Sequence, residues 1–305
     1  MDSMPYSGQH LKRPASQAPR RDAGKWVVSA ARLVTLTVMA QASDVVSPSA
    51  AGAARAGPKG RREAAAPAYP ERVQAVLDHL EANPMRLQSI PMIYEADCSS
   101  AHLPAAVQGL TPEDVMPPPS QRRGADPQAA EHFARVVAGL LYVACGGLDQ
   151  AHNLVTPLCW GAPTPYGGKP IPGSPAAQDA SYVHALVHRA EGLHDGEFGT
   201  GFSNANYWYA ATGPHPVHPR VLDSMRRHAA AAGDARLQQL AANHGDAFSP
   251  AKWVAVCAEA ARGGGAGGAG GGGRDAALAG WCERVAADEF RALLEHCYSR
   301  LAAVA

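Results

Sequence analysis

The order of helix starts and stops is the feature that most constrains how this chain can fold. Four dipeptides place a proline where a helix can begin: Asp126-Pro127, Ser174-Pro175, His218-Pro219 and Ser249-Pro250. Proline suits the first helical turn because a backbone N–H has no intrahelical partner there. Apolar residues then recur at three- and four-residue intervals, and nothing alternates with period two over a useful length. The sequence therefore predicts an all-α protein, an irregular array of helical hairpins.

Composition divides the chain into four parts. Residues 1–68 are rich in Ala, Ser, Pro, Gly and Arg and poor in acidic residues, as in a chloroplast or mitochondrial transit segment; a disordered tail on a cytoplasmic protein is the alternative. Residues 69–262 carry the helical periodicity and form the predicted core domain. The run 263–273 is almost pure glycine, which predicts a flexible linker. Residues 274–305 predict a last helix that docks on the core.

Charge and hydrophobicity narrow the range of partners. The chain of 305 residues has 27 basic and 27 acidic side chains, and this balance argues against nucleic acid. The apolar run 26–39 is interrupted by Arg32 and is too short to span a membrane. The six cysteines include no Cys-x-x-Cys, which favours a reducing compartment. A small molecule or a peptide is the expected partner.

Two histidines lie four residues apart on the helix predicted between Ser174 and Gly192. His184 and His188 are therefore one turn apart on one face, where both can bind the same metal ion. The zincin pattern needs a glutamate directly after the first histidine, and this chain has Ala185 there. The pair thus indicates a possible divalent metal site outside the zincin class. A stripe of solvated histidines is the alternative.

Polar residues on neighbouring segments complete the predicted site. The candidates for a third metal ligand are His152, His215, Glu191 and Glu197. Glu191 and Glu197, together with Arg189, are the candidate catalytic residues. Several convergent polar side chains are typical of a binding pocket. The proline- and glycine-containing loop 159–173 leads into the histidine helix, so we expect it to form a lid or a pocket wall.

A glycine-rich turn precedes the next helix, for which Ser203 is the predicted N-cap. Free N–H groups at a helix N-terminus can bind an anion, but the glycine spacing matches neither a P-loop nor a dinucleotide fingerprint. The candidate ligand-binding residues lie on this turn and helix: Gly199, Gly201, Asn204, Asn206, Tyr207 and Trp208.

Two groups of motifs carry resemblances. GLLY at 139–142 and GLDQAH at 147–152 resemble a helix and its partner in tetratricopeptide or Sel1-like hairpins. HALVHRAE at 184–191, SNANYW at 203–208 and GPHP at 213–216 resemble a widespread family of uncharacterised proteins. The first resemblance implies a helical-hairpin fold. The second implies that this segment forms a unit of one shared design, and it does not imply an activity.

Three functions are consistent with these patterns. Helical hairpins form grooves, so the first hypothesis is a binding or scaffold protein with a polar pocket lined by His, Glu and Asn. The alternative is a metal-dependent enzyme, hydrolytic or oxidative, with His184 and His188 as ligands. A metal-free enzyme that uses a histidine and a glutamate as acid and base is the third.

Overall fold

The computed structural model describes residues 68–305, except 88, 95–97, 197 and 263–274. These residues belong to one compact unit, Glu63–Ala305. The prediction of an N-terminal extension over residues 1–68 falls outside the described residues except for residue 68, and the prediction of a glycine linker over residues 263–273 falls outside them entirely.

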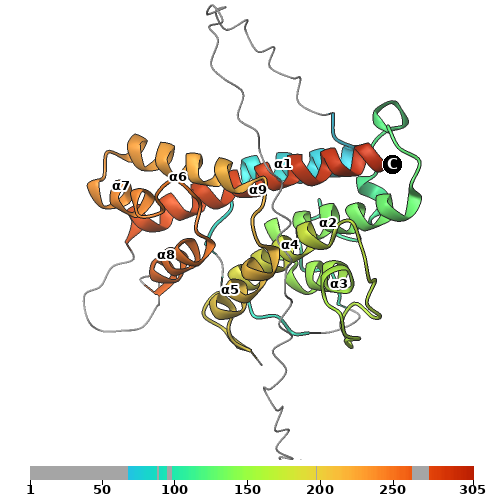
Figure 1. Ribbon diagram of the computed structural model, residues 1–305, viewed down its shortest axis with the longest axis horizontal. Helices are drawn as coiled ribbons and strands as arrows, with labels where there is room; N and C mark the ends of the chain where they lie inside the picture. The colour runs from blue at the N-terminus through green and yellow to red at the C-terminus, as the bar shows by residue number, and fades with distance from the viewer. Residues whose placement is uncertain (1–67, 88, 95–97, 197, 263–274) are drawn as a thin grey trace, which may run out of the picture. The chain divides into compact units, whose positions relative to one another are not determined.

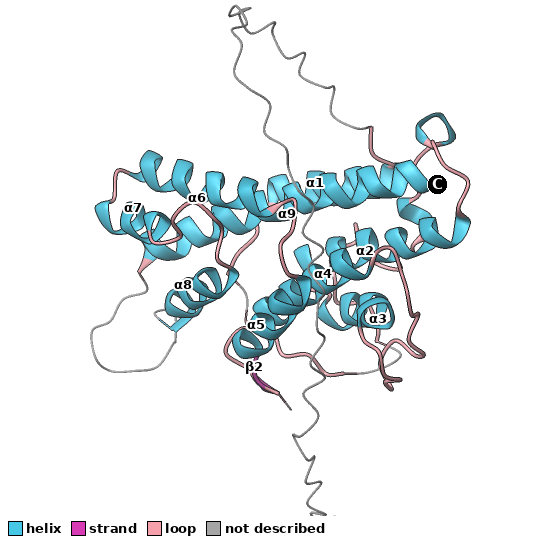
Figure 2. Ribbon diagram, viewed as in Figure 1, coloured by secondary structure: helices cyan, strands magenta, loops and turns pink. Residues whose placement is uncertain are grey.

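Helices account for nearly all the regular structure of the described residues (Figures 1 and 2). They are α1 (Glu71–Ala82), α2 (Pro127–Ala144), α3 (Leu148–Cys159), α4 (Ala177–Glu191), α5 (Gly201–Thr212), α6 (His218–Ala232), α7 (Ala235–Ala242), α8 (Pro250–Arg262) and α9 (Ala276–Val304). Two-residue strands, β1 (Asp195–Gly196) and β2 (Gly199–Thr200), pair antiparallel between α4 and α5. The prediction of an all-α fold is confirmed for this part of the chain.

Helix α4 lies at the centre of the packing. It contacts α2, α3 and α5, and every side chain from Asp179 to Arg189 is buried. The long helix α9 packs against α2, α6 and α8 (Figure 1). When a helix is buried on all sides, its polar side chains must find their hydrogen-bond partners within the protein. The polar groups of α4 therefore require partners on neighbouring elements.

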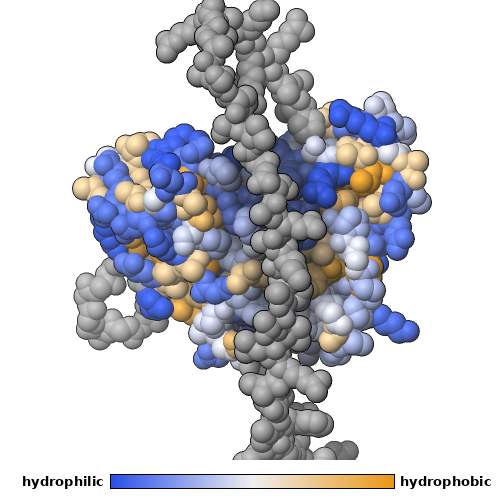
Figure 3. All heavy atoms as spheres, in the orientation of Figure 1, coloured by the Kyte–Doolittle hydropathy of each residue, from blue (hydrophilic) through white to orange (hydrophobic). Residues whose placement is uncertain are grey.

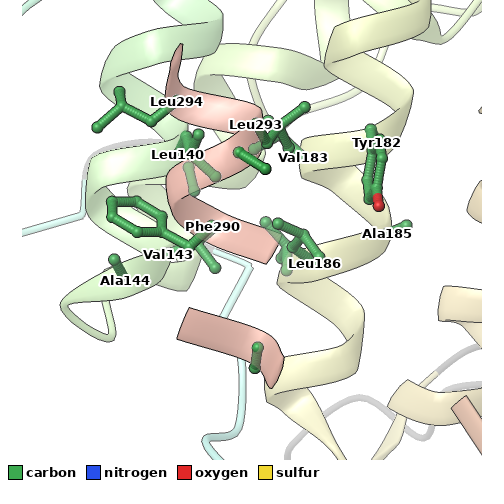
Figure 4. Packing of buried hydrophobic residues seen from close by; sticks show 14 of the residues in the cluster. Leu140, Val143, Ala144, Tyr182, Val183, Ala185, Leu186, Phe290, Leu293 and Leu294 are labelled. Atoms are coloured by element: carbon green, nitrogen blue, oxygen red, sulfur yellow. The ribbon is translucent and has the colours of Figure 1, made fainter. Parts of the chain in front are cut away.

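The apolar part of this core joins α2, α4 and α9. Figure 4 shows Val183 and Leu186 of α4 near Leu140 of α2 and near Phe290 and Leu293 of α9. Each fully buried side chain of this size contributes about 1.5–3 kcal/mol to folding. On the face seen in Figure 3, hydrophilic and single apolar residues are interspersed over α6 and α7, as is usual for a solvated surface.

Two helix starts differ from those predicted. Helix α4 begins at Ala177 rather than at Ser174, whose hydroxyl accepts a hydrogen bond from Ala176 N at 3.2 Å and lies 3.1 Å from His132 Nδ1. Helix α5 begins at Gly201, and its N-cap is Thr200, whose hydroxyl accepts from the backbone N–H of Ser203. The predicted cap at Ser203 is wrong because the hairpin before α5 supplies a cap three residues earlier.

One buried ionic network joins four helices. Glu289 of α9 is fully buried, and its Oε1 accepts hydrogen bonds from the hydroxyls of Tyr182 of α4 and Tyr209 of α5, both at 2.9 Å. Its Oε2 accepts from Trp253 Nε1 of α8 at 3.3 Å and pairs with the guanidinium of Arg189 of α4. Both carboxylate oxygens are therefore satisfied, and together these bonds fix α4, α5 and α8 against α9.

Removing the cation from this network is expected to destabilise the fold strongly. Burial alone lowers the pKa of Arg189, but the Glu289 carboxylate raises it above its usual range, so the guanidinium is charged. Arg189→Met leaves a buried carboxylate without its cation, and we expect a loss of about 3–5 kcal/mol in the free energy of unfolding, measured by urea denaturation. Arg220→Met is the matched control, since Arg220 pairs with Glu295 on the surface, where such pairs contribute at most about 1 kcal/mol. Equal, small losses in both variants would contradict this role.

Candidate metal centre

Three histidines converge between α3 and α4. His152 of α3 and His184 and His188 of α4 each offer one ring nitrogen, and these nitrogens all lie within 4.8 Å of one another. Their exposed fractions are 7%, 2% and 2%. The alternative of a solvated histidine stripe is therefore wrong. The structure brings together the predicted pair and one of the predicted third ligands.

The contacts of His188 define its tautomer. Its Nδ1 lies 2.9 Å from Glu191 Oε2, and an ionised carboxylate can only accept, so Nδ1 carries the proton. The side-chain amide nitrogen of Asn204 lies 3.0 Å from Nε2 and 3.3 Å from Nδ1, so it contacts the ring and does not occupy the lone pair of Nε2. With its proton on Nδ1, His188 has an unprotonated Nε2, and its ring orientation is fixed by a buried carboxylate.

His184 has a buried nitrogen that lacks a partner. The thiol of Cys159 donates to the Val155 carbonyl at 3.3 Å, so the Nδ1–H of His184, 3.5 Å away, donates to Sγ. This leaves Nε2 as an acceptor, and Nε2 is buried with no hydrogen-bond partner among the described residues. Burial, reinforced by His152 and His188, holds the pKa of His184 well below its usual range, so the ring is neutral.

His152 is also neutral. Burial, with the neighbouring His188, lowers its pKa to about 3. The Thr156 hydroxyl donates to the His152 carbonyl at 2.6 Å, so an oxygen lone pair is left facing His152 Nδ1 at 3.4 Å. A neutral imidazole with one unprotonated ring nitrogen is the form in which histidine binds metal ions.

Residues that the sequence did not nominate surround the three rings. Tyr94 lies edge-on to His152 at a centroid distance of 5.7 Å, and its hydroxyl donates to Glu191 Oε1 at 3.4 Å. Its backbone has a φ of 55°, and Asp149 Oδ1 accepts its N–H at 2.7 Å. Cys159 contacts His184, and burial raises the pKa of this thiol to about 12, so it stays protonated.

Of the predicted ligand-binding residues on α5, two reach the histidines. Asn204 contacts His188, and Trp208 stacks on His184 with ring centroids 3.8 Å apart. Asn206 and Tyr207 are exposed on the other sides of the helix.

The two predicted glycines have packing and turn roles. A Cβ at Gly201 would lie 2.4 Å from the His188 carbonyl oxygen, so this glycine permits α5 to approach α4. Gly199 has a φ of 88° in the hairpin.

Two other predicted site residues, Arg189 and His215, lie in other clusters, and a third is not described. Arg189 binds Glu289 and Tyr209 in the buried network described above. Glu197 lies outside the described residues. His215 belongs to a different cluster, so its prediction as a ligand beside His184 is wrong.

The second cluster consists of Asp179, His215 and His296. The backbone N–H of Val217 donates to His215 Nδ1 at 3.3 Å, so His215 carries its proton on Nε2 and donates it to Asp179 Oδ1 at 2.8 Å. Burial alone raises the pKa of Asp179, but the hydrogen bonds from His215 and from His296 lower it to about 2. The Nε2 of His215 has no lone pair for a metal, so this cluster is a hydrogen-bonded structural contact.

Comparisons of the chain with protein-family models, with curated proteins and with solved structures found no match. Among the described residues, no helix combines the length and the apolar character that crossing a membrane requires. The resemblances to helical repeats and to the uncharacterised family therefore stay predictions.

The hydrogen bonds predict opposite tautomers in the two clusters. In metal-free protein, we expect His184 and His188 to carry the proton on Nδ1, and His215 to carry it on Nε2, because each is fixed by the partner described above. Long-range ¹H–¹⁵N NMR of the imidazole rings distinguishes the two forms. The signals are assigned with His184→Gln, His188→Gln and His215→Gln, and a protonated Nε2 on His184 would contradict the geometry of the site.

Proposed function

We propose that this chain is a metal-dependent enzyme of the hydrolytic class, with one divalent transition-metal ion held by His152, His184 and His188. The observation that carries the proposal is the buried, unpartnered Nε2 of His184 beside the rings of His152 and His188. A buried acceptor without a partner costs about 1–3 kcal/mol, and a ligand at this nitrogen recovers that cost. Imidazole ligands suit zinc and its late first-row neighbours, so zinc is the first ion to test.

The ligand count favours a catalytic over a structural ion. Structural zinc sites are closed by four protein ligands, whereas catalytic sites have three and keep one position open. The nearby thiol of Cys159 contacts Nδ1 of His184, the nitrogen on the far edge of the ring from Nε2, so it is not a fourth ligand. A zinc ion in such an open site lowers the pKa of its bound water to about 7. The Asn204 amide, 3.0 Å from His188 Nε2, is placed to hydrogen-bond a substrate oxygen beside the ligands.

Glu191 acts in this proposal as a positioning residue. Its Oε2 accepts from His188 and its Oε1 from the Tyr94 hydroxyl, so neither oxygen is directed at a reacting water. A carboxylate on the far nitrogen of a metal-bound histidine fixes the ring and increases its basicity. In this position, the Glu191 carboxylate increases metal affinity and is not placed to transfer a proton.

Binding of a small molecule by the helical array is the second candidate function. It is supported by a separate cavity of about 600 Å³ at α5, α6 and α8. The metal centre and this cavity involve different residues, so the two functions are tested independently.

The metal proposal predicts about one zinc ion per chain. We expect stoichiometric zinc in purified full-length protein, or after metal-free protein is loaded with zinc, by elemental analysis and calorimetry. His152→Gln and His184→Gln are expected to lose stoichiometric zinc, since each removes one of three ligands. His102→Gln is the control, because His102 is exposed and lies outside the cluster. Failure of folded wild-type protein to bind zinc, cobalt, nickel or copper would overturn the metal site.

The proposed hydrolytic activity is tested on the same samples. Zinc-loaded protein is expected to cleave p-nitrophenyl acetate or p-nitrophenyl phosphate faster than metal-free protein and faster than His184→Gln. Equal rates in all three samples would remove the enzymatic proposal while the binding result would stand.

Substituting Glu191 tests the carboxylate that positions His188. Glu191→Gln keeps the size of the side chain but removes its charge, and we expect zinc affinity to fall about 10- to 100-fold with stoichiometry retained. Competition with a chromogenic chelator measures the change. Glu81→Gln, an exposed substitution of the same type, is the control. Unchanged affinity in Glu191→Gln would show that the contact with His188 has no role in metal binding.

A further inference from the structure

A second cavity, of about 700 Å³, lies between α1 and α9 (Figure 1). Two contacts show that these helices run antiparallel along it. Arg86, which follows α1, pairs with Glu283 at 3.1 Å, and the ring of Tyr69, which precedes α1, lies 4.8 Å from the ring of Tyr298. Sites that bind small organic molecules have volumes of about 300–1,000 Å³, so this cavity is large enough for one.

The cavity is an elongated groove. Its lining on α9 extends from Gly280 to Glu295, which is about 22 Å of helix. Spread over this length, the volume corresponds to a mean width of about 6 Å, whereas a helix with its side chains is about 10–12 Å across. The groove is therefore too narrow to seat a partner helix. Its two walls are helices, so an extended peptide would find no strand edge for its backbone, whereas an alkyl chain has no polar group to satisfy.

Apolar side chains line the groove along much of its length. They are Leu77, Leu80, Met85, Ala287, Phe290 and Leu294. Leu77, Met85 and Ala287 are half-buried, so part of their apolar surface is open to a ligand. The flexible side chain of Met85 can also adapt to the shape of a bound chain. An alkyl chain in the groove would remove this apolar surface from water.

The charges at one end of the groove offset one another. Arg86 pairs there with Glu283. Arg284, the next residue on α9, and Glu81, in the last turn of α1, also line this end and have opposite charges. These four side chains therefore give that end no net charge.

Arg291, farther along α9, is a cation without a counter-ion. It lines the groove, is exposed, and forms no ion pair with the described residues. The acids one turn away on either side are already paired, Asp288 with Arg227 and Glu295 with Arg220, both at 2.7 Å. An arginine stem can lie along an apolar wall while its guanidinium stays in water. A carboxylate at the mouth of the groove can therefore pair with Arg291 without being buried.

We propose that this groove binds a fatty acid, a monocarboxylate with an unbranched alkyl tail. The carboxylate pairs with Arg291, and the tail extends over Ala287 and Phe290 toward Gly280. A cationic amphiphile has the same tail but is repelled by Arg291. The groove shares no residue with the histidine cluster, so this proposal is independent of the enzymatic one.

Three matched probes test the head and the tail of the ligand separately. Decanoate has the carboxylate and the tail, decylamine has an ammonium group on the same tail, and acetate has the carboxylate alone. Binding to the full-length protein is measured by ¹H–¹⁵N NMR titration, below the concentration at which each amphiphile forms micelles. We expect decanoate to bind with a dissociation constant below about 1 mM, and the other two probes to bind at least about tenfold more weakly. No binding of decanoate at about 5 mM, or equal binding of decanoate and decylamine, would overturn the proposal.

Variants locate the binding to this groove. Arg291→Gln is expected to lower affinity for decanoate about tenfold and to leave affinity for decylamine unchanged or higher. Ala287→Phe places a ring in the path of the tail, so it is expected to weaken decanoate at least about tenfold. Arg123→Gln is the control, since Arg123 is exposed and does not line the groove. Arg291 is exposed too, so its variant is expected to fold, and decanoate affinity that Arg291→Gln leaves unchanged would refute the assignment.

Discussion

The fully buried carboxylate of Glu289 is the interaction on which the arrangement of the central helices depends. A carboxylate without water needs several donors, and here the donors come from α4, α5 and α8. Apolar packing alone tolerates small shifts between helices, whereas a hydrogen-bonded ion pair fixes their rotation. Since Tyr182 and Arg189 of α4 face this network, the opposite side of α4 is turned toward α3.

That rotation is what brings the metal-centre residues together. His184 and His188 stack one turn apart on the side of α4 that meets α3, and α3 contributes His152 there. The rotation of helix α5 is fixed in the same way. Its Tyr209 binds Glu289, while its Asn204 and Trp208 contact the histidines. The buried network and the histidine cluster thus lie on two sides of the pair α4 and α5. A shift of either helix in the network therefore changes the geometry of the histidine cluster.

The sequence predicted the local part of this arrangement well. Helical periodicity located the helices, and the four-residue spacing of His184 and His188 placed both rings on one face. His152 was a candidate only by residue type, since its approach to α4 depends on how two helices pack. The wrong assignment of His215 has the same origin, because a backbone N–H from Val217, invisible in the sequence, sets its tautomer. Tyr94 was missed since its segment has no periodicity, and its position depends on a hydrogen bond to Asp149.

The depth of the histidine cluster limits how a substrate of the proposed enzyme could reach it. Helices α2, α4 and α5 close most directions with tightly packed side chains. The loop 159–173 covers the cluster at two points: Trp160 packs on Trp208, which stacks on His184, and Tyr166 lies beside His152 with ring centroids 6.1 Å apart. Trp160 directly follows α3 and opens the loop expected to be a lid, and moving a loop disrupts fewer backbone hydrogen bonds than separating helices. Movement of this loop is therefore the route of lowest cost to the histidines, and it leaves the Glu289 network intact.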